Sequence, residues 1–181
     1  MLRAVRCSAV APLFFPLALL TLLLGGSPGV SQAQTNWDRY TPGTIAAIMQ
    51  QHDSSIRADY DPKYPSFVIS GDGFPTLARV TYRGDSRPLN PKNRDVMRRW
   101  SLTFLRDTSV VLDFHREYLF KEGTRLLWLP VQDSVAGYFA RELHRGQPVT
   151  LYVIWAGAYY AGEGIIWTFL VNEFRADSSA R

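Results

Sequence analysis

Three side chains that can ligate a metal alternate along one short stretch, Asp113-Phe114-His115-Arg116-Glu117. If this stretch is a β-strand, its side chains alternate between two faces, and Asp113, His115 and Glu117 share one of them. Carboxylate and imidazole groups arranged in this way suit a divalent metal ion. If the stretch is helical, His115 turns away from the two acids. We expect a solvated strand face whose charges pair with neighbouring arginines, and a metal site is the alternative.

A second feature is a concentration of positive charge in the middle of the chain. Eight basic residues stand against two acidic ones between Arg79 and Arg106, and seven of the eight are arginine. The planar guanidinium group suits the oxygens of phosphate, sulfate or carboxylate. The arginines that we expect to contact an anionic ligand are Arg83, Arg87, Arg98 and Arg99. In the alternative interpretation this charge is only the solvated face of a helix.

Two neighbouring tyrosines, Tyr159 and Tyr160, offer aromatic contact area close to several glycines. We expect them in a glycine-rich loop that joins the last two strands between Gly157 and Gly164. Aromatic rings stack on the bases of a single-stranded polyanion while basic side chains follow its backbone. The two tyrosines are therefore candidate ligand-binding residues together with the four arginines. Alternatively, they fold back over the end of the sheet.

The sequence contains none of the more specific catalytic patterns that we sought. No serine stands in a Gly-x-Ser-x-Gly elbow, and no Gly-x-x-x-x-Gly-Lys loop is present to cradle a phosphate. The histidines His52, His115 and His144 do not have the spacing of zinc ligands. The residues therefore indicate no particular reaction, and we expect no cofactor.

Helices and strands that position these side chains can be predicted from the hydrophobic pattern. Helices are expected where apolar residues recur every three to four positions after a capping residue, starting at Thr41-Pro42, Asn90-Pro91 and Asp133. A strand over Trp100–Leu105 is the rival interpretation of the second helix, and residues 108–114 show no clear pattern. Strands are expected at Ser66–Ser70, Thr76–Arg83, Arg116–Lys121, Thr124–Val131, Val149–Ala156 and Ile165–Phe174.

The last two predicted strands are apolar on both faces, which is typical of strands inside a sheet. We therefore expect their tryptophans, Trp155 and Trp167, to be buried. From Thr76 onward the order is strand, long connection, two strands, helix, two strands, which is the chain order of the OB-fold. We predict an α+β chain built on a small five-stranded OB-like β-barrel, with a helix between the third and fourth strands and extra N-terminal helices. The alternative is an open antiparallel sheet packed by helices.

Two segments in the second half of the chain carry a family resemblance. They are Trp128-Leu129-Pro130-Val131-Gln132 and Leu170-Val171-Asn172-Glu173-Phe174. Both resemble segments of exported bacterial OB-fold-like proteins of unknown function. The resemblance implies an exported barrel domain and no particular activity.

The first 33 residues have the pattern of a secretory signal peptide. Arg3 and Arg6 precede the apolar run Leu13–Leu24, and residues 31–33 supply a site for cleavage. An uncleaved N-terminal anchor is the alternative. We expect the mature chain to begin at residue 34 and to be exported to the periplasm or the medium. It would contain no cysteine, because the single cysteine, Cys7, precedes the cleavage site.

After the signal peptide we predict an N-terminal helix and linker over residues 34–65, the barrel domain over residues 66–175 and a disordered tail over residues 176–181. No stretch of the mature chain has the apolar length of a membrane span. A signal peptide, a cluster of arginines with nearby tyrosines and the lack of a catalytic pattern together favour a secreted or periplasmic, non-catalytic binding module. Its partner would be an anionic polymer, a glycan or an envelope protein. The alternative is a secreted metal-dependent hydrolase such as a phosphodiesterase.

Overall fold

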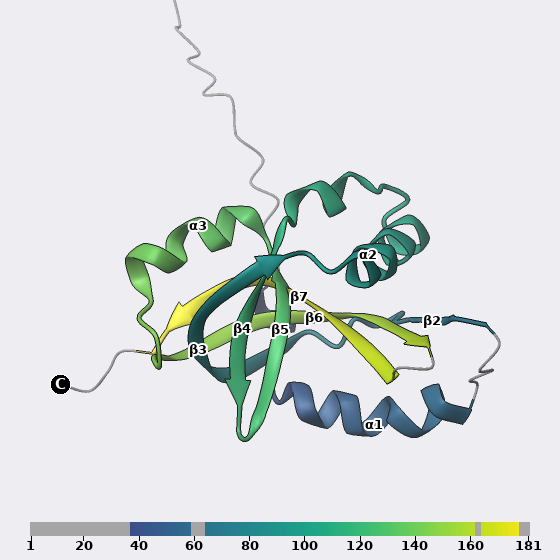
Figure 1. Ribbon diagram of the computed structural model, residues 1–181, viewed down its shortest axis with the longest axis horizontal. Coiled ribbons are helices and arrows are strands. Elements are labelled where there is room, and N and C mark those ends of the chain that lie inside the picture. The colour runs from purple at the N-terminus through teal and green to yellow at the C-terminus, as the bar shows by residue number, and fades with distance from the viewer. Residues whose placement is uncertain (1–36, 59–63, 162–163, 178–181) are drawn as a thin grey trace, which may run out of the picture. The chain divides into compact units, whose positions relative to one another are not determined.

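The structure of the chain is a computed structural model that describes residues 37–58, 64–161 and 164–177 (Figure 1). The predicted signal peptide, part of the predicted linker and the last residues of the predicted tail lie outside the described residues. Among the helices that are described, none is long and apolar enough to cross a membrane.

Seven strands of the described residues form one mixed sheet. They are β1 (Thr41–Gly43), β2 (Ser66–Ile69), β3 (Thr76–Pro88), β4 (Arg116–Glu122), β5 (Arg125–Val131), β6 (Pro148–Ala161) and β7 (Gly164–Ala176). The strand order is β1-β3-β4-β5-β7-β6-β2, and β3 also pairs with β6. The strands β3, β4, β5, β7 and β6 therefore follow one another in a ring of hydrogen-bonded neighbours. The pairs β1–β3 and β5–β7 are parallel, and the other pairs are antiparallel.

Helices pack on this sheet, so the chain is α+β as predicted. The α-helices of the described residues are α1 (Ile45–Ala58), α2 (Pro91–Phe104) and α3 (Asp133–Glu142), and the 3-10 helices are η1 (Trp37–Arg39) and η2 (Ser109–Asp113). The prediction of a helix that starts at Asn90-Pro91 is confirmed, because α2 includes Trp100–Phe104, nearly all of the segment with the rival strand interpretation. Its predicted cap is also confirmed, since the side chain of Asn90 accepts a hydrogen bond from the backbone N–H of Lys92 at 2.9 Å.

Two helices begin differently from their predicted starts. Thr41–Gly43 pairs with β3 as a strand, and α1 begins after it, with the hydroxyl of Thr44 accepting a backbone N–H of the first turn. The buried carboxylate of Glu122, at the end of β4, accepts the N–H groups of the first two helical residues at 2.9 and 2.8 Å. Asp133 is the first residue of α3 rather than its cap, which is Gln132. For α1, the partner of the first two N–H groups, Glu122, comes from a distant part of the chain.

The main hydrophobic core lies on one face of the ring strands, where α1 and α3 pack against it. Ile45 of α1, Phe120 of β4 and Phe139 of α3 are almost completely buried in it. A smaller cluster, which includes Val96 and Met97 of α2, lies on the opposite face of β6 and β7. Strand alternation therefore sends neighbouring side chains of β6 and β7 into two different clusters.

The two tryptophans expected in the core differ in burial. Trp155 of β6 is 2% exposed, which confirms its prediction. Trp167 of β7 is only partly buried, so the prediction of full burial is wrong for this residue. Its ring centre lies 5.8 Å from that of Trp155, and its side chain lines a surface hollow next to α1.

Candidate ligand-binding surface

Strand β3 extends to Pro88, beyond its predicted end at Arg83, and this places Arg87 in a strand rather than in the connection after it. Arg83 lies in the strand, as predicted. The register with β4 shifts between Tyr82 and Ser86. Gly84 lies in this irregular segment with φ +80°, a conformation that favours glycine. Because Tyr82 points into the main core, its neighbour Arg83 points to the opposite face of the sheet.

The opposite face of β3, β4 and β5 combines positive and apolar side chains. Phe120 of β4 and both Leu127 and Leu129 of β5 point into the main core, so their neighbours along each strand point away from it. Leu119 lies opposite Trp128 in the register of the two strands. We call this outer surface the strand face, and its members are Arg83, Arg87, Leu119, Lys121, Leu126 and Trp128.

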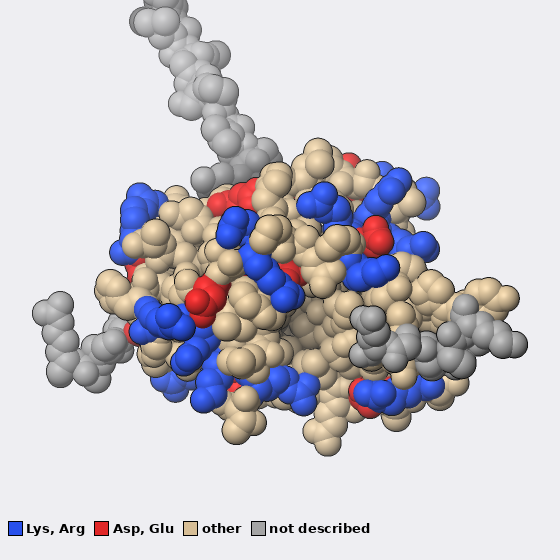
Figure 2. All heavy atoms as spheres, in the orientation of Figure 1, with Lys and Arg blue, Asp and Glu red and all other residues tan. Residues whose placement is uncertain are grey.

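The strand face is accessible to a ligand. Leu126 is 58% exposed, and Lys121 is exposed as well. The strands β3, β4 and β5 are turned towards the viewer in Figure 1, and Figure 2 shows several Lys and Arg side chains on this side next to a hollow lined by uncharged residues. An apolar floor with positive charge around it can hold a ligand that has both a flat surface and anionic groups.

Arg87 is held in place from two directions. Its Nε donates a hydrogen bond to Oε2 of Glu117 at 2.6 Å, and its guanidinium carbon lies 4.4 Å from the centre of the Trp128 ring. The Glu117 side chain is completely buried, whereas 42% of the Arg87 side chain is exposed. The guanidinium group is therefore fixed by a buried carboxylate and an indole ring while part of it remains open to solvent.

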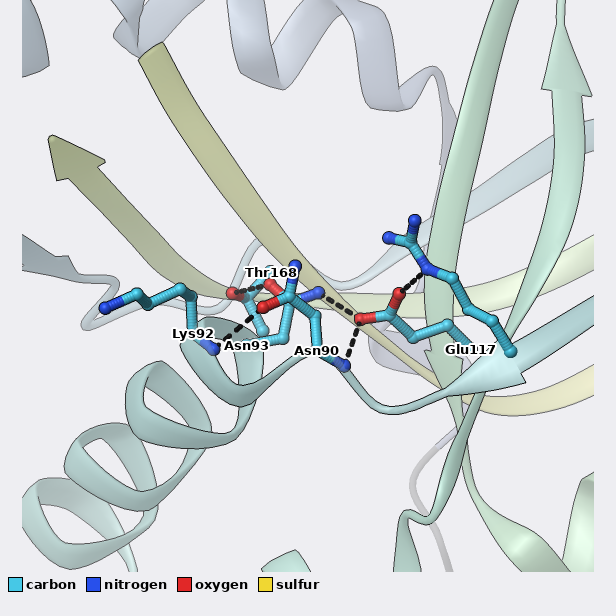
Figure 3. A network of polar contacts seen from close by, with 6 residues as sticks. Asn90, Lys92, Asn93, Glu117 and Thr168 are labelled. Atoms are coloured by element: carbon cyan, nitrogen blue, oxygen red, sulfur yellow. Dashed lines mark hydrogen bonds and ion pairs between the residues drawn. The ribbon is translucent and has the colours of Figure 1, made fainter. Parts of the chain in front are cut away.

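The other oxygen of Glu117 connects this pair to α2 and β7, as Figure 3 shows. Oε1 accepts hydrogen bonds from the backbone N–H of Asn90 at 3.1 Å and from Nδ2 of Asn93 at 2.5 Å. The hydroxyl of Thr168 in turn donates to Oδ1 of Asn93 at 2.8 Å. A buried carboxylate is costly unless it is paired and hydrogen-bonded, and β3, α2 and β7 together meet this requirement.

The alternating acids and histidine do not come together as a metal site. Glu117 points towards α2, whereas His115 lies before β4 with its Nδ1 2.5 Å from Oδ2 of Asp133. Asp113 ends η2, so strand alternation does not reach it and the expectation of one shared face is wrong. Within the described residues, no group of three His, Cys, Asp or Glu side chains is arranged to hold a metal ion.

Tyr159 and Tyr160 lie in strand β6, so their predicted placement in a loop is wrong. Tyr159 is buried under α2, against Phe67 and with Nζ of Lys92 4.5 Å from its ring centre. Tyr160 packs on the main core, with the guanidinium of Arg57 5.9 Å from its ring centre. The nearby glycines suggest a loop in the sequence, but β2 and β7 pair with this segment on both sides. The two rings therefore do not form one ligand surface.

Arg98 and Arg99 lie on the exposed side of α2, and neither belongs to the strand face. The guanidinium carbon of Arg99 lies 4.0 Å from the ring centre of Phe67. Among the described residues, Arg98 has no ion-pair partner. The six candidate residues therefore separate into a strand pair (Arg83 and Arg87), a helix pair and two packed tyrosines.

Leu119, Lys121, Leu126 and Trp128 belong to the strand face but are not among the six residues predicted from the sequence. Trp128 is missed because a large apolar side chain in a strand suggests a core residue. The signal for its outward position is the alternation of Leu127, Leu129 and Val131, which all point into the main core. Period two then places Trp128 on the other face.

Another hollow, of about 430 Å³, lies between α1, the first residue of β5 and the first half of β7. Met49, Asp53, Arg125 and Trp167 are among the residues that line it. A hydrogen bond from Arg57 holds the pKa of the Asp53 carboxyl below its usual range, so this acid stays ionised. The hollow therefore carries charges of both signs, unlike the strand face, whose exposed charged members are all positive.

The fold and this surface define an α+β domain with a basic and aromatic sheet face. Comparison of the chain with protein-family models, with curated proteins and with solved structures finds no match.

Proposed function

We propose that the chain is an exported, non-catalytic binding module built on an OB-like β-barrel, and that it binds an anionic polymer or glycan. Support for the barrel comes from the ring order β3-β4-β5-β7-β6, together with α3 between the third and fourth of these strands along the chain. A five-stranded Greek-key barrel of the OB type would have this arrangement. Export rests on the signal-peptide pattern of residues 1–33.

The observation that carries the proposal is the position of Arg87 between Trp128 and the buried Glu117. In OB-folds the ligand surface is the face of the second and third strands with the loops beside them. The corresponding strands are β4 and β5, and the connection beside them contains α2. A guanidinium group that is already fixed loses little conformational freedom when it binds an anion, which favours affinity.

Arg83 and Lys121 provide the test, because they carry the charge of the strand face outside the buried network. We expect Arg83→Ala combined with Lys121→Ala to weaken binding of oligothymidylate and of a sulfated polysaccharide by about tenfold in moderate salt. The salt dependence should become shallower. The magnitude of the slope of log affinity against log salt concentration should decrease by about one to two, because each lost phosphate contact reduces it by about one. Titrations at several salt concentrations measure both quantities.

A matched control removes two exposed arginines elsewhere, Arg141 on α3 and Arg175 on β7. Arg141→Ala combined with Arg175→Ala changes the net charge equally and should leave affinity and slope nearly unchanged. Equal losses in both double variants would mean that net charge alone attracts the probes, and the strand face would then not be the binding site.

A further inference from the structure

A second surface, separate from the strand face, is formed by α2 and η2. Leu102, Leu105 and Leu112 are 59%, 50% and 71% exposed. They are three of the eight large apolar side chains that are exposed among the described residues, and they fall within a short stretch of chain. Burying a leucine is favourable, so exposed leucines close together along the chain indicate a contact surface.

Helix α2 arranges two of these leucines in line with two arginines. Arg94, Arg98 and Leu102 are separated by four residues each, so they lie along one side of the helix, and Leu105, its C-cap residue, follows three residues later. All four side chains are exposed, whereas the opposite side of α2 is buried against β6 and β7. We call these four residues the helix stripe, which is positive in its first half and apolar in its second.

Residues around the helix stripe add to its positive charge and to its apolar character. η2 packs beside α2 and contributes Leu112, and residues 96–106 contain three arginines and no acid. Asp95 is the acidic residue within α2, and Asp107 after the helix is engaged by Ser109. Figure 2 shows Lys and Arg side chains gathered over α2. Neither Arg94 nor Arg98 forms an ion pair with another described residue.

We propose that the helix stripe and Leu112 dock on the surface of an anionic lipid bilayer. The leucines enter the boundary between headgroups and acyl chains, and the arginines contact lipid phosphates. Highly exposed leucines at a helix end, beside arginines without an ion-pair partner among the described residues, suit insertion into a bilayer whose headgroups are anionic. The proposal does not depend on a ligand at the strand face.

Vesicle co-sedimentation of the full chain tests this proposal, with all variants in the same background so that the N-terminal residues contribute equally. The probes are vesicles of phosphatidylcholine with and without phosphatidylglycerol. We expect binding to the anionic vesicles, and a loss of about tenfold or more for Leu102→Ser combined with Leu105→Ser and for Arg94→Ala combined with Arg98→Ala. The anionic lipid should be required, since phosphatidylcholine carries no net charge.

A control on another helix replaces an exposed aromatic residue and an arginine of α3, Tyr138→Ser combined with Arg141→Ala. This control, and the strand-face variant Arg83→Ala with Lys121→Ala, should bind anionic vesicles like the unaltered chain. The proposal is overturned if the stripe variants bind as well as the unaltered chain, or if the α3 control loses as much. It is also overturned if vesicles are not bound and the leucine variant instead dissociates a dimer, which would make the surface a protein interface.

Discussion

Replacement of Gly157 by alanine is expected to prevent folding or to lower the free energy of unfolding by at least about 3 kcal/mol. An added Cβ atom would lie 2.0 Å from the carbonyl oxygen of Val68 and 3.1 Å from its carbonyl carbon. Gly157 also has φ +148°, which side-chain-bearing residues rarely adopt. The opposing atoms belong to the backbone of β2, which is paired with β6, so no side-chain rotation can relieve the contact.

Urea unfolding followed by circular dichroism measures this effect. The control is Gly137→Ala in α3, where an added Cβ meets no atom within 4 Å. That variant should gain about 0.5–1 kcal/mol, because alanine is favoured over glycine inside a helix. A Gly157→Ala variant as stable as the unaltered chain would contradict the close approach of β2 to β6.

Replacement of Glu117 by alanine is the second large effect, with an expected cost of about 3–5 kcal/mol. The substitution leaves Arg87 without its counter-charge, and it removes the acceptor of the hydrogen bonds from Asn90 and Asn93. A polar group that stays buried without its partner carries the full cost of its lost solvation.

A double-mutant cycle separates this pairing from simple loss of volume. Glu117→Leu combined with Arg87→Met removes both charges, so it should be less damaging than Glu117→Leu alone, because no unpaired charge remains. Urea unfolding of the four chains gives the coupling. Additive effects of the two substitutions would show that the carboxylate and the guanidinium do not interact in solution.

The elements predicted most closely are those whose signals are local. The β4–β5 hairpin matches its expected strands to within a residue at each end, because alternation and the turn at Gly123 lie within one short stretch. Helix α2 likewise begins at a cap that its own sequence contains, Asn90. The errors arise where pairing between distant segments decides the outcome. β6 continues past Gly157 because β2 and β7 pair with it.

The same distinction applies to the candidate site. The expectation of arginines that contact an anionic ligand gave two members of the strand face, Arg83 and Arg87, since residue type alone suggests this role. The features that orient Arg87 could not be predicted, because Glu117 is distant in sequence and becomes its partner only when β3 pairs with β4. The placement of the two tyrosines is wrong for a similar reason, because the local glycines indicate a loop and the pairing of β6 with β2 and β7 cannot be seen in the sequence.

The most direct test of the strand face as a binding surface is a titration of the ¹⁵N-labelled chain, observed by ¹H–¹⁵N correlation spectroscopy, with oligothymidylate and separately with a sulfated polysaccharide. The indole N–H of Trp128, assigned with a Trp128→Phe variant, and the Nε–H of Arg87 report on the stacked pair itself. Binding at this face predicts that both signals shift and saturate together with the backbone amides of β4 and β5 for at least one probe, while α3 is unaffected. If neither probe moves these two signals, or if all shifts fall on α2 or α3, the strand face is not the ligand-binding surface.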